Sequence, residues 1–240
     1  MKVMRIADLY CCSGGATRGY QQAAAKAGVA VHVTGFDIKR QRRYAGDVFE
    51  QRDVLSITAD ELRERFDAVH ASPKCQRFTK MRNAPNAKGD EHPNQIPDTL
   101  AILQQSGLPW LLENVEDAAP WMPGAITLCG TMFGLGAQGC ELQRHRLFMA
   151  NFPISPPGPC THSGGPVIGV YGGHGRVRSA KHGGRGTRDV WVGGHRAACS
   201  EAMGMEWATL DELSEAIPPA YTEHLGLQLI QHIQSQRLAA

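Results

Sequence analysis

The stretch Asp8-Leu9-Tyr10-Cys11-Cys12-Ser13-Gly14-Gly15 decides the fold of this chain, because it joins two segments of different character. Residues 3–10 alternate in polarity and start with a β-branched residue, which predicts a strand. Residues 16–27 are rich in helix formers and end at Gly28, a typical C-cap residue. Strand, glycine turn and helix form the first half of a βαβ unit, in which backbone can approach a ligand at the helix N-terminus. The glycines do not complete a G-x-G-x-x-G motif and are weak evidence alone.

Strands and helices continue to alternate after this unit. We expect strands at 29–36, just before Asp53, at 66–71 and at 108–112, with helices at 58–65 and 98–106. Residues 125–128 and 147–151 predict two more strands, an antiparallel pair at the far edge of the sheet. We therefore expect an α/β fold, a Rossmann-like sheet with helices on both faces.

The middle of the chain changes composition after residue 152. Residues 153–195 are turn-rich, so we expect a small lobe between a main domain at 1–152 and helices within 196–240 that complete that domain. Residues 164–194 hold eleven of the 27 glycines and five Lys or Arg residues against one acid. Such a segment suits contact with a phosphate backbone, although a solvated surface loop explains it equally well.

Composition excludes several classes of protein. The chain has 240 residues, is 42% hydrophobic and carries a net charge of only +2. It has neither an apolar run of about 18 residues nor a signal peptide, so we expect a cytoplasmic protein without membrane contact. Seven cysteines with no C-x-x-C pair argue against disulfides and against a zinc site, and Cys160-Thr161-His162 is an isolated near-match. We expect no metal.

Chemically active side chains stand at the ends of two expected strands. The run 66–71 leads into Pro73 and Cys75, and the strand at 108–112 leads into Glu113. Ligands bind at carboxyl ends of strands in open α/β sheets, so these two side chains should face one pocket. Arg144 and Arg146 stand two apart before a strand and should share a face. Taken singly, a buried structural cysteine, a capping acid and a solvated strand edge are the simpler explanations.

Together these stretches resemble the DNA cytosine-5 methyltransferase family of compact bacterial or phage type. Pro73-Lys74-Cys75-Gln76 is similar to its nucleophile motif, Glu113-Asn114-Val115 to its Glu-Asn-Val motif, and Arg144-His145-Arg146 to its Arg-x-Arg motif. Ala216-Ile217-Pro218 resembles its closing motif. The resemblance covers almost the whole chain. It implies a methyltransferase sheet in residues 1–152 that binds S-adenosylmethionine, and a target-recognition lobe in residues 153–195.

The resemblance also implies site residues. Catalytic roles fall on Cys75, Glu113, Arg144 and Arg146. Cofactor-binding roles fall on Asp8, Tyr10, Cys12, Ser13, Gly14, Gly15, Asp37, Ile38, Asp53, Val54, Pro73, Lys74, Leu100, Glu215 and Ala216. Contacts to double-stranded DNA fall on Gln76, Thr79, Arg176, Arg178 and Arg185, and residues 77–97 would close over the site. The chain differs from the family at four positions: the family has glycine, proline, glutamine and asparagine where this chain has Cys12, Lys74, Leu142 and Glu215.

The implied reaction begins with addition of the Cys75 thiolate to C6 of cytosine, which makes C5 able to attack a methyl group. Glu113 would hydrogen-bond N3 and the amine, and Arg146, supported by Arg144, would hold O2. The base must be flipped out of the duplex. We expect a monomer that serves restriction-modification or phage DNA modification.

Three other functions and one other donor stay open at this point. A dinucleotide oxidoreductase shares the βαβ opening, an inactive DNA-binding relative shares the fold, and a tRNA cytosine-5 enzyme shares the chemistry. Lys74 stands where the family places a proline beside the donor's sulfonium. It could face a DNA phosphate, pair with Glu215, or bind carboxy-S-adenosylmethionine, in which case the product would be 5-carboxymethylcytosine.

Overall fold

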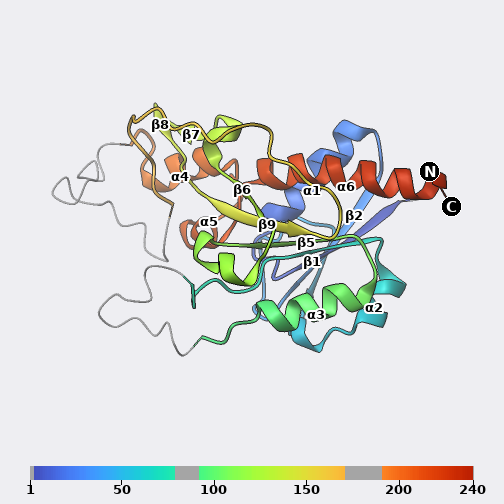
Figure 1. Cartoon of the computed structure of the whole chain (residues 1–240). Helices are drawn as coiled ribbons and strands as arrows, with labels where there is room; N and C mark the ends of the chain where they lie inside the picture. Colours follow the sequence, from blue (N-terminus) through green and yellow to red (C-terminus); the bar gives the residue numbers. More distant parts are fainter. Residues whose placement is uncertain (1–2, 79–91, 171–190, 240) are drawn as a thin grey trace.

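The computed structural model describes residues 3–78, 92–170 and 191–239, which form a seven-stranded sheet between two layers of helices (Figure 1). The strands lie in the order β3-β2-β1-β4-β5-β9-β6. Neighbours from β3 to β5 are parallel, and β9 is antiparallel to both β5 and β6. The bounds are β1 Met4–Leu9, β2 Val31–Asp37, β3 Val48–Gln51, β4 Ala68–Ala71, β5 Trp110–Asn114, β6 Ile126–Leu128 and β9 Arg146–Ala150. The expected α/β fold and the antiparallel pair at its edge are confirmed.

The two faces of the sheet are covered by different helices. Met4 and Ile6 of β1 pack with the long helices α1 (Gly15–Ala27) and α6 (Pro219–Ala239). Ala7 and Leu9, on the opposite face, pack with α2 (Ala59–Arg65) and α3 (Ile96–Ser106). Figure 1 shows these pairs of helices above and below the sheet. Successive side chains of a strand point to opposite faces, so one apolar strand supplies both cores.

Helices α1 and α6 approach each other closely. A Cβ added at Gly19 would lie 2.1 Å from the hydroxyl oxygen of Thr222 and 2.2 Å from the carbonyl oxygen of Pro219. The Thr222 hydroxyl donates a 2.9 Å hydrogen bond to the Ala16 carbonyl across this contact. Glycine at position 19 therefore fixes the distance between the helix that follows β1 and the helix that closes the chain.

A third core cluster lies beyond the sheet edge. It joins α4 (His195–Met203), α5 (Leu210–Glu215) and the hairpin β7 (Gly136–Ala137) and β8 (Cys140–Glu141) to Ile168, Val170 and Trp191. The Ile168 amide donates to the Glu141 carbonyl at 2.9 Å. The Val192 amide and carbonyl both bond the Gln138 side chain, each at 2.9 Å. Ile168 and Val192 are thus both held on one hairpin. The expected domain boundaries at 152 and 195 stay a prediction.

Some elements differ from their expected bounds. β5 starts at Trp110, because Pro109 has no N–H for the ladder and the Asn151 side chain caps the Trp110 amide at 2.8 Å. It continues through Glu113 and Asn114, which pair with β9. Helix α5 was not expected, although Thr209 and Glu212 form a capping box at its start. Short 3-10 helices cover Val54–Ser56, Glu116–Trp121 and Gly130–Phe133.

In the part of the chain that the structure describes, no helix has the length and apolar character needed to cross a membrane.

Candidate active site

The candidate site lies where the strand order reverses, since β2 and β4 flank β1 on opposite sides. β1, β4 and β5 end at Leu9, Ala71 and Asn114, so the residues that follow them meet at one sheet edge. In doubly wound sheets this crevice binds the ligand. As expected, the segment that carries Cys75 and the end of β5 that carries Glu113 follow neighbouring parallel strands, and the turn at 8–15 joins them at the same edge.

The turn between β1 and α1 has an unusual backbone. Tyr10 and Cys12 adopt positive φ angles of 61° and 46°, and Gly14 adopts 85°. A left-handed conformation costs a residue with a Cβ about 1–2 kcal/mol, so Cys12 in a glycine position must be held by its surroundings. Asp37 at the end of β2 does this, because its carboxylate accepts the Cys12 amide at 3.2 Å and the Lys39 amide at 2.8 Å. Each carboxylate oxygen keeps a second lone pair for a ligand hydroxyl.

Asp8 lies buried at the base of this turn. The Thr17 hydroxyl of α1 donates to its Oδ2 at 2.5 Å, and its Oδ1 has no hydrogen-bond partner among the described residues. Burial raises the pKa of Asp8 from 3.8 to about 7, and the hydrogen bond from Thr17 opposes this shift. Asp8 therefore ties β1 to α1 and does not reach the surface of the crevice.

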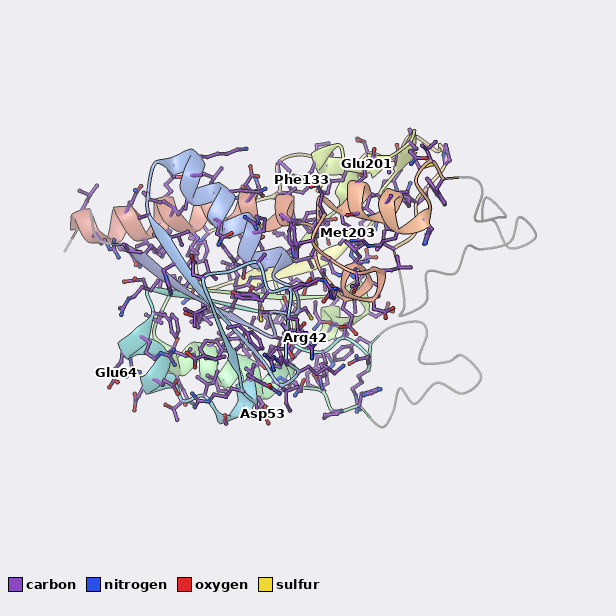
Figure 2. All side chains as sticks on the ribbon, turned by 180° about the vertical axis from the view of Figure 1, so that it is seen from behind. Arg42, Asp53, Glu64, Phe133, Glu201 and Met203 are labelled. Carbon is purple, nitrogen blue, oxygen red and sulfur yellow. The ribbon has the colours of Figure 1, made fainter. Side chains whose placement is uncertain are left out.

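The other expected cofactor-binding residues surround the turn. Tyr10 and Leu100 both pack against the core on the α2–α3 side of the sheet, and Tyr10 hydrogen-bonds the Thr99 hydroxyl at 2.9 Å. Asp53 caps a 3-10 helix by accepting the Leu55 amide at 3.1 Å, next to buried Val54. Figure 2 shows Asp53 on the same side of the sheet as Glu64 of α2, with Met203 of α4 across the sheet. Ile38, directly after β2, is exposed. The Ser13 carbonyl accepts a hydrogen bond from the Trp207 indole at 2.9 Å. The Cys12 sulfur lies 4.0 Å from the Glu215 carboxylate.

Glu113 and Arg146 form an ion pair at the other side of the crevice. The Arg146 Nε lies 3.2 Å from Oε1 of Glu113, whose side chain is 8% exposed. Burial raises the pKa of Glu113, and the charge of Arg146 opposes this. Burial also raises the pKa of the Cys75 thiol, which Arg146 lowers and Glu113 raises further. These mutual effects place Cys75, Glu113 and Arg146 in one electrostatic group.

A buried chain of hydrogen bonds lies behind Glu113, and sequence reasoning missed it. Tyr20 of α1 bonds Nδ1 of His70 at 2.9 Å, and Nε2 of His70 bonds the Ser72 hydroxyl at 2.9 Å. Ser72 hydrogen-bonds Glu113 and lowers the pKa of Glu113. When Ser72 donates to the carboxylate, its oxygen accepts from Nε2–H, and Nδ1 then accepts from Tyr20. Burial lowers the pKa of His70 to about 3, so the ring stays neutral, and a histidine inside the apolar run 66–71 was the available signal.

Arg144 has a different environment from Arg146. It is 1% exposed, and its guanidinium donates to the carbonyls of Val170, Ser214 and Ala216, the last two at 2.8 and 2.7 Å. The Tyr221 hydroxyl donates to the Arg144 carbonyl at 2.5 Å. Arg144 therefore joins the closing motif to the active-site strand, and its positive charge lowers the pKa of both Cys75 and Glu113. The two arginines do not share one task.

The segment that carries Cys75 is fastened to β5. The Asn114 side chain donates to the Pro73 carbonyl at 2.9 Å. Pro73 is buried, whereas Lys74 and Gln76 are exposed. Within the described ranges no ion pair joins Lys74 to Glu215, so the pairing that was one of the three accounts of Lys74 is not observed. The expected nucleic-acid contacts Thr79, Arg176, Arg178 and Arg185 lie outside the described residues, as does most of the segment 77–97.

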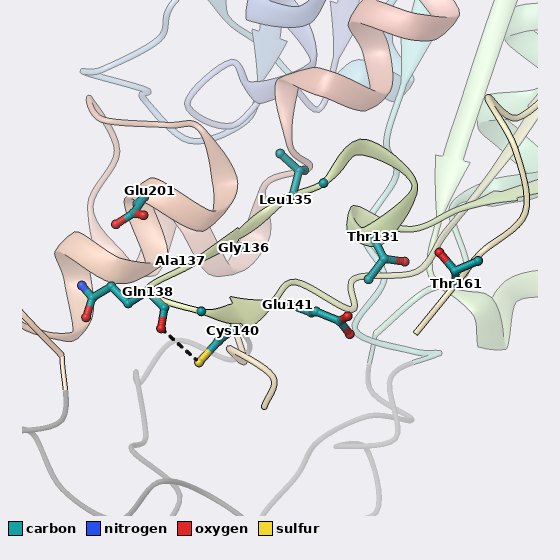
Figure 3. Close-up of a pocket in the computed structure, with 11 residues that line it drawn as sticks. Thr131, Leu135, Gly136, Ala137, Gln138, Cys140, Glu141, Thr161 and Glu201 are labelled. Carbon is teal, nitrogen blue, oxygen red and sulfur yellow. Dashed lines mark hydrogen bonds between the residues drawn. The ribbon is translucent and has the colours of Figure 1, made fainter. Parts of the chain in front are cut away.

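A pocket of about 410 Å³ lies elsewhere, between the β7–β8 hairpin, Glu201 of α4, and Thr131 with Thr161 (Figure 3). Its lining includes none of the expected catalytic residues. We place the chemistry in the crevice at the sheet edge, where Glu113, Arg146 and Cys75 lie.

Comparison with solved structures places this fold among methyltransferases. The Schizosaccharomyces pombe Dnmt2 methyltransferase is similar with a TM-score of 0.55 and 17% identity, over 97% of this chain and 99% of that one. The Entamoeba histolytica methyltransferase EhMeth is similar with a TM-score of 0.56 and 11% identity, over the same shares. The comparisons with family models and with curated proteins gave no match. The shared feature is the fold of these methyltransferases over nearly the whole chain.

Proposed function

We propose that this protein transfers a methyl group from S-adenosylmethionine to C5 of a flipped-out cytosine in double-stranded DNA. The observation that carries the proposal is the buried Glu113–Arg146 pair in one electrostatic group with Cys75, at the topological switch point. An oxidoreductase would need the glycine turn but has no use for this group. The fold shared with two methyltransferases supports the same choice.

The crevice fits the proposed donor, which supplies an electrophilic methyl group when bound. Asp37 and Glu215 lie beside the turn that leads into α1. Negative side chains favour a sulfonium, and the spare lone pairs of Asp37 suit a ribose hydroxyl. Tyr10 and Leu100 provide an apolar wall for the adenine. Exposed Lys74 fits contact with a phosphate better than contact with the donor.

The three side chains divide the work. The Cys75 sulfur bonds C6, the C5 electrons take the methyl group, C5 then loses its proton, and the S–C6 bond breaks to restore the thiol. Glu113 donates a proton toward N3, for which its raised pKa prepares it, while Arg146 faces the charge that develops at O2. The state with a protonated Glu113 and a Cys75 thiolate has the same net charge as the state with an ionised Glu113 and a Cys75 thiol. The pair can therefore redistribute its proton without adding charge to a buried site.

A covalent trap tests the proposal. Duplex DNA containing 5-fluorocytosine, incubated with the protein and S-adenosylmethionine, should give an adduct that survives a denaturing gel, because fluorine blocks loss of the C5 substituent. Cys75→Ser should abolish the adduct, and Cys140→Ser, a thiol outside the crevice, should keep it. An equal yield from Cys75→Ser would contradict the proposal. Adduct with 5-fluorocytosine RNA but not with DNA would assign the chemistry to RNA.

The donor is tested in the same reactions by mass spectrometry of the nucleosides. We expect 5-methylcytosine, and Lys74→Pro should form it at a similar or higher rate. Formation of 5-carboxymethylcytosine from carboxy-S-adenosylmethionine, weakened selectively by Lys74→Pro, would replace the methyl donor with the carboxylated one.

A further inference from the structure

Two cysteines and two histidines converge outside the candidate active site. Cys129 follows β6, His145 immediately precedes β9, and Cys160 and His162 belong to the irregular segment 151–170. One potential ligand atom from each lies within 4.8 Å of the other three. His145 and Cys160, which follow Cys129 by 16 and 31 positions along the chain, thus lie beside it together with His162. No sequence motif indicates this convergence.

Three sulfur–nitrogen separations are close to the edges of a small tetrahedron, two within its range and one slightly shorter. Nε2 of His162 lies 3.0 Å from the Cys160 sulfur and 3.5 Å from the Cys129 sulfur, and Nε2 of His145 lies 3.4 Å from the Cys160 sulfur. Tetrahedral zinc, with Zn–S near 2.3 Å and Zn–N of about 2.0–2.1 Å, holds its ligand atoms about 3.3–3.8 Å apart. The two imidazoles are tilted by 60°, so their nitrogens converge without stacking of the rings.

Neighbouring polar groups support these four side chains. The Thr131 hydroxyl donates to the Cys129 sulfur at 3.3 Å and lies 3.7 Å from the Cys160 sulfur. Nδ1 of His145, the nitrogen directed away from the sulfurs, lies 3.8 Å from Oε2 of Glu116. A hydroxyl on a thiolate and a carboxylate behind a histidine are the usual second layer of a metal site. Figure 3 shows Thr131 and Thr161 at the same end of the adjoining pocket.

Weak bonds alone do not account for this cluster. Cys160 and His162 are exposed, and residues 155–167 are nearly all exposed with neither helix nor strand. A thiol is a weak hydrogen-bond donor, and exposed contacts of this kind would not order such a segment. A metal bound by four protein ligands supplies folding free energy directly.

We propose that Cys129, His145, Cys160 and His162 bind one structural zinc ion. Two thiolates and two imidazoles balance the charge of Zn²⁺ and close its coordination, so no position is left for a substrate. The ion would fasten segment 151–170 to β6 and to His145, which stands between Arg144 and Arg146. It would therefore hold the start of the Gly-rich basic segment against the active-site strand. This replaces the expectation, drawn from the lack of a C-x-x-C pair, that the chain binds no metal.

Metal analysis of the full-length protein, expressed with added zinc and kept reduced, tests the site. We expect about one zinc per chain. Cys160→Ser and His162→Ala should each weaken zinc affinity at least about tenfold, measured by competition with a chromogenic chelator. Both positions are exposed, so circular dichroism should show a folded core. Cys75→Ser and His32→Ala, matched residues outside the cluster, should keep the metal.

Cobalt titration gives a second readout that does not depend on catalysis. Co²⁺ added to zinc-free protein should produce the visible absorption of a tetrahedral site together with sulfur-to-cobalt charge transfer. Both bands should weaken in Cys160→Ser and persist in Cys75→Ser. Zinc-free protein from supplemented cells with no cobalt spectrum would overturn the proposal. A Cys129–Cys160 disulfide in the protein as purified under reducing conditions would overturn it as well.

Discussion

Glu113 shows how one carboxyl group is prepared by the groups around it. Burial raises its pKa, while Arg146 and the Ser72 hydroxyl lower it, and Ser72 is in turn oriented by His70 and Tyr20. The sequence predicted Glu113 because an acid follows an apolar strand. It did not predict the chain behind it, because His70 and Ser72 reach Glu113 only when β4 and β5 pair. A side chain's identity is visible in sequence, whereas its hydrogen-bond partners depend on tertiary structure.

Replacing Glu113 by glutamine should separate catalysis from binding. Glutamine keeps the shape and hydrogen-bonding capacity but cannot deliver a proton, so we expect methyl transfer to fall at least about a hundredfold. DNA affinity, measured by fluorescence anisotropy, should change little. Glu64→Gln, on the exposed face of α2, is the control and should match the unmodified protein. Normal methylation by Glu113→Gln would remove the acid role assigned to this residue.

At the scale of elements, β1 and α1 are joined by the buried Asp8–Thr17 hydrogen bond. Because the pKa of Asp8 is about 7 in the folded chain and near 3.8 when unfolded, folding takes up a proton between these values. The stabilising contribution is complete below about pH 4, falls by about 1.4 kcal/mol per pH unit between about pH 4 and 7, and changes no further above pH 7.

Asp8→Asn should remove this dependence. Asparagine stays neutral and can still accept from Thr17, so the unfolding free energy of the variant should fall less than that of the unmodified protein between about pH 4 and 7. Urea unfolding at several pH values measures this, with the exposed change Asp60→Asn as the control. The same decline in Asp8→Asn and Asp60→Asn would show that another group titrates.

The elements also mark the limit of pattern reading. Alternation of strands and helices predicted the sheet, and a Gly-rich turn predicted the crevice. Arg144 was expected to support Arg146 in catalysis, and the bonds of its guanidinium to the carbonyls of residues 170, 214 and 216 were not expected. The four side chains of the sulfur–imidazole cluster span 34 positions and converge only because segment 151–170 folds back on β6. Spacing along the chain carries no signal for such contacts.

At the scale of the whole molecule, donor binding should stabilise the fold before any nucleic acid is present. S-adenosylhomocysteine, the product form of the donor, at about 100 times its Kd would add about 2.7 kcal/mol. For a chain of this size that raises Tm by roughly 5–11 °C. Scanning fluorimetry measures the shift, with NAD⁺ as the comparison ligand. A shift with NAD⁺ and none with S-adenosylhomocysteine would favour the oxidoreductase.

The contacts that hold Val167 and Val192 on the β7–β8 hairpin have a consequence for how this protein could diversify. Glu141 holds the chain at Val167 and Gln138 holds it at Val192, so the intervening stretch begins and ends on one rigid support. Lengthening a closed loop is inexpensive, since each doubling costs only about 0.6 kcal/mol. Residues 171–190 can therefore be exchanged as a cassette, from one homologue to another or in a designed library, while the core contacts of Ile168, Val170 and Trp191 and the sheet with its catalytic edge are inherited unchanged.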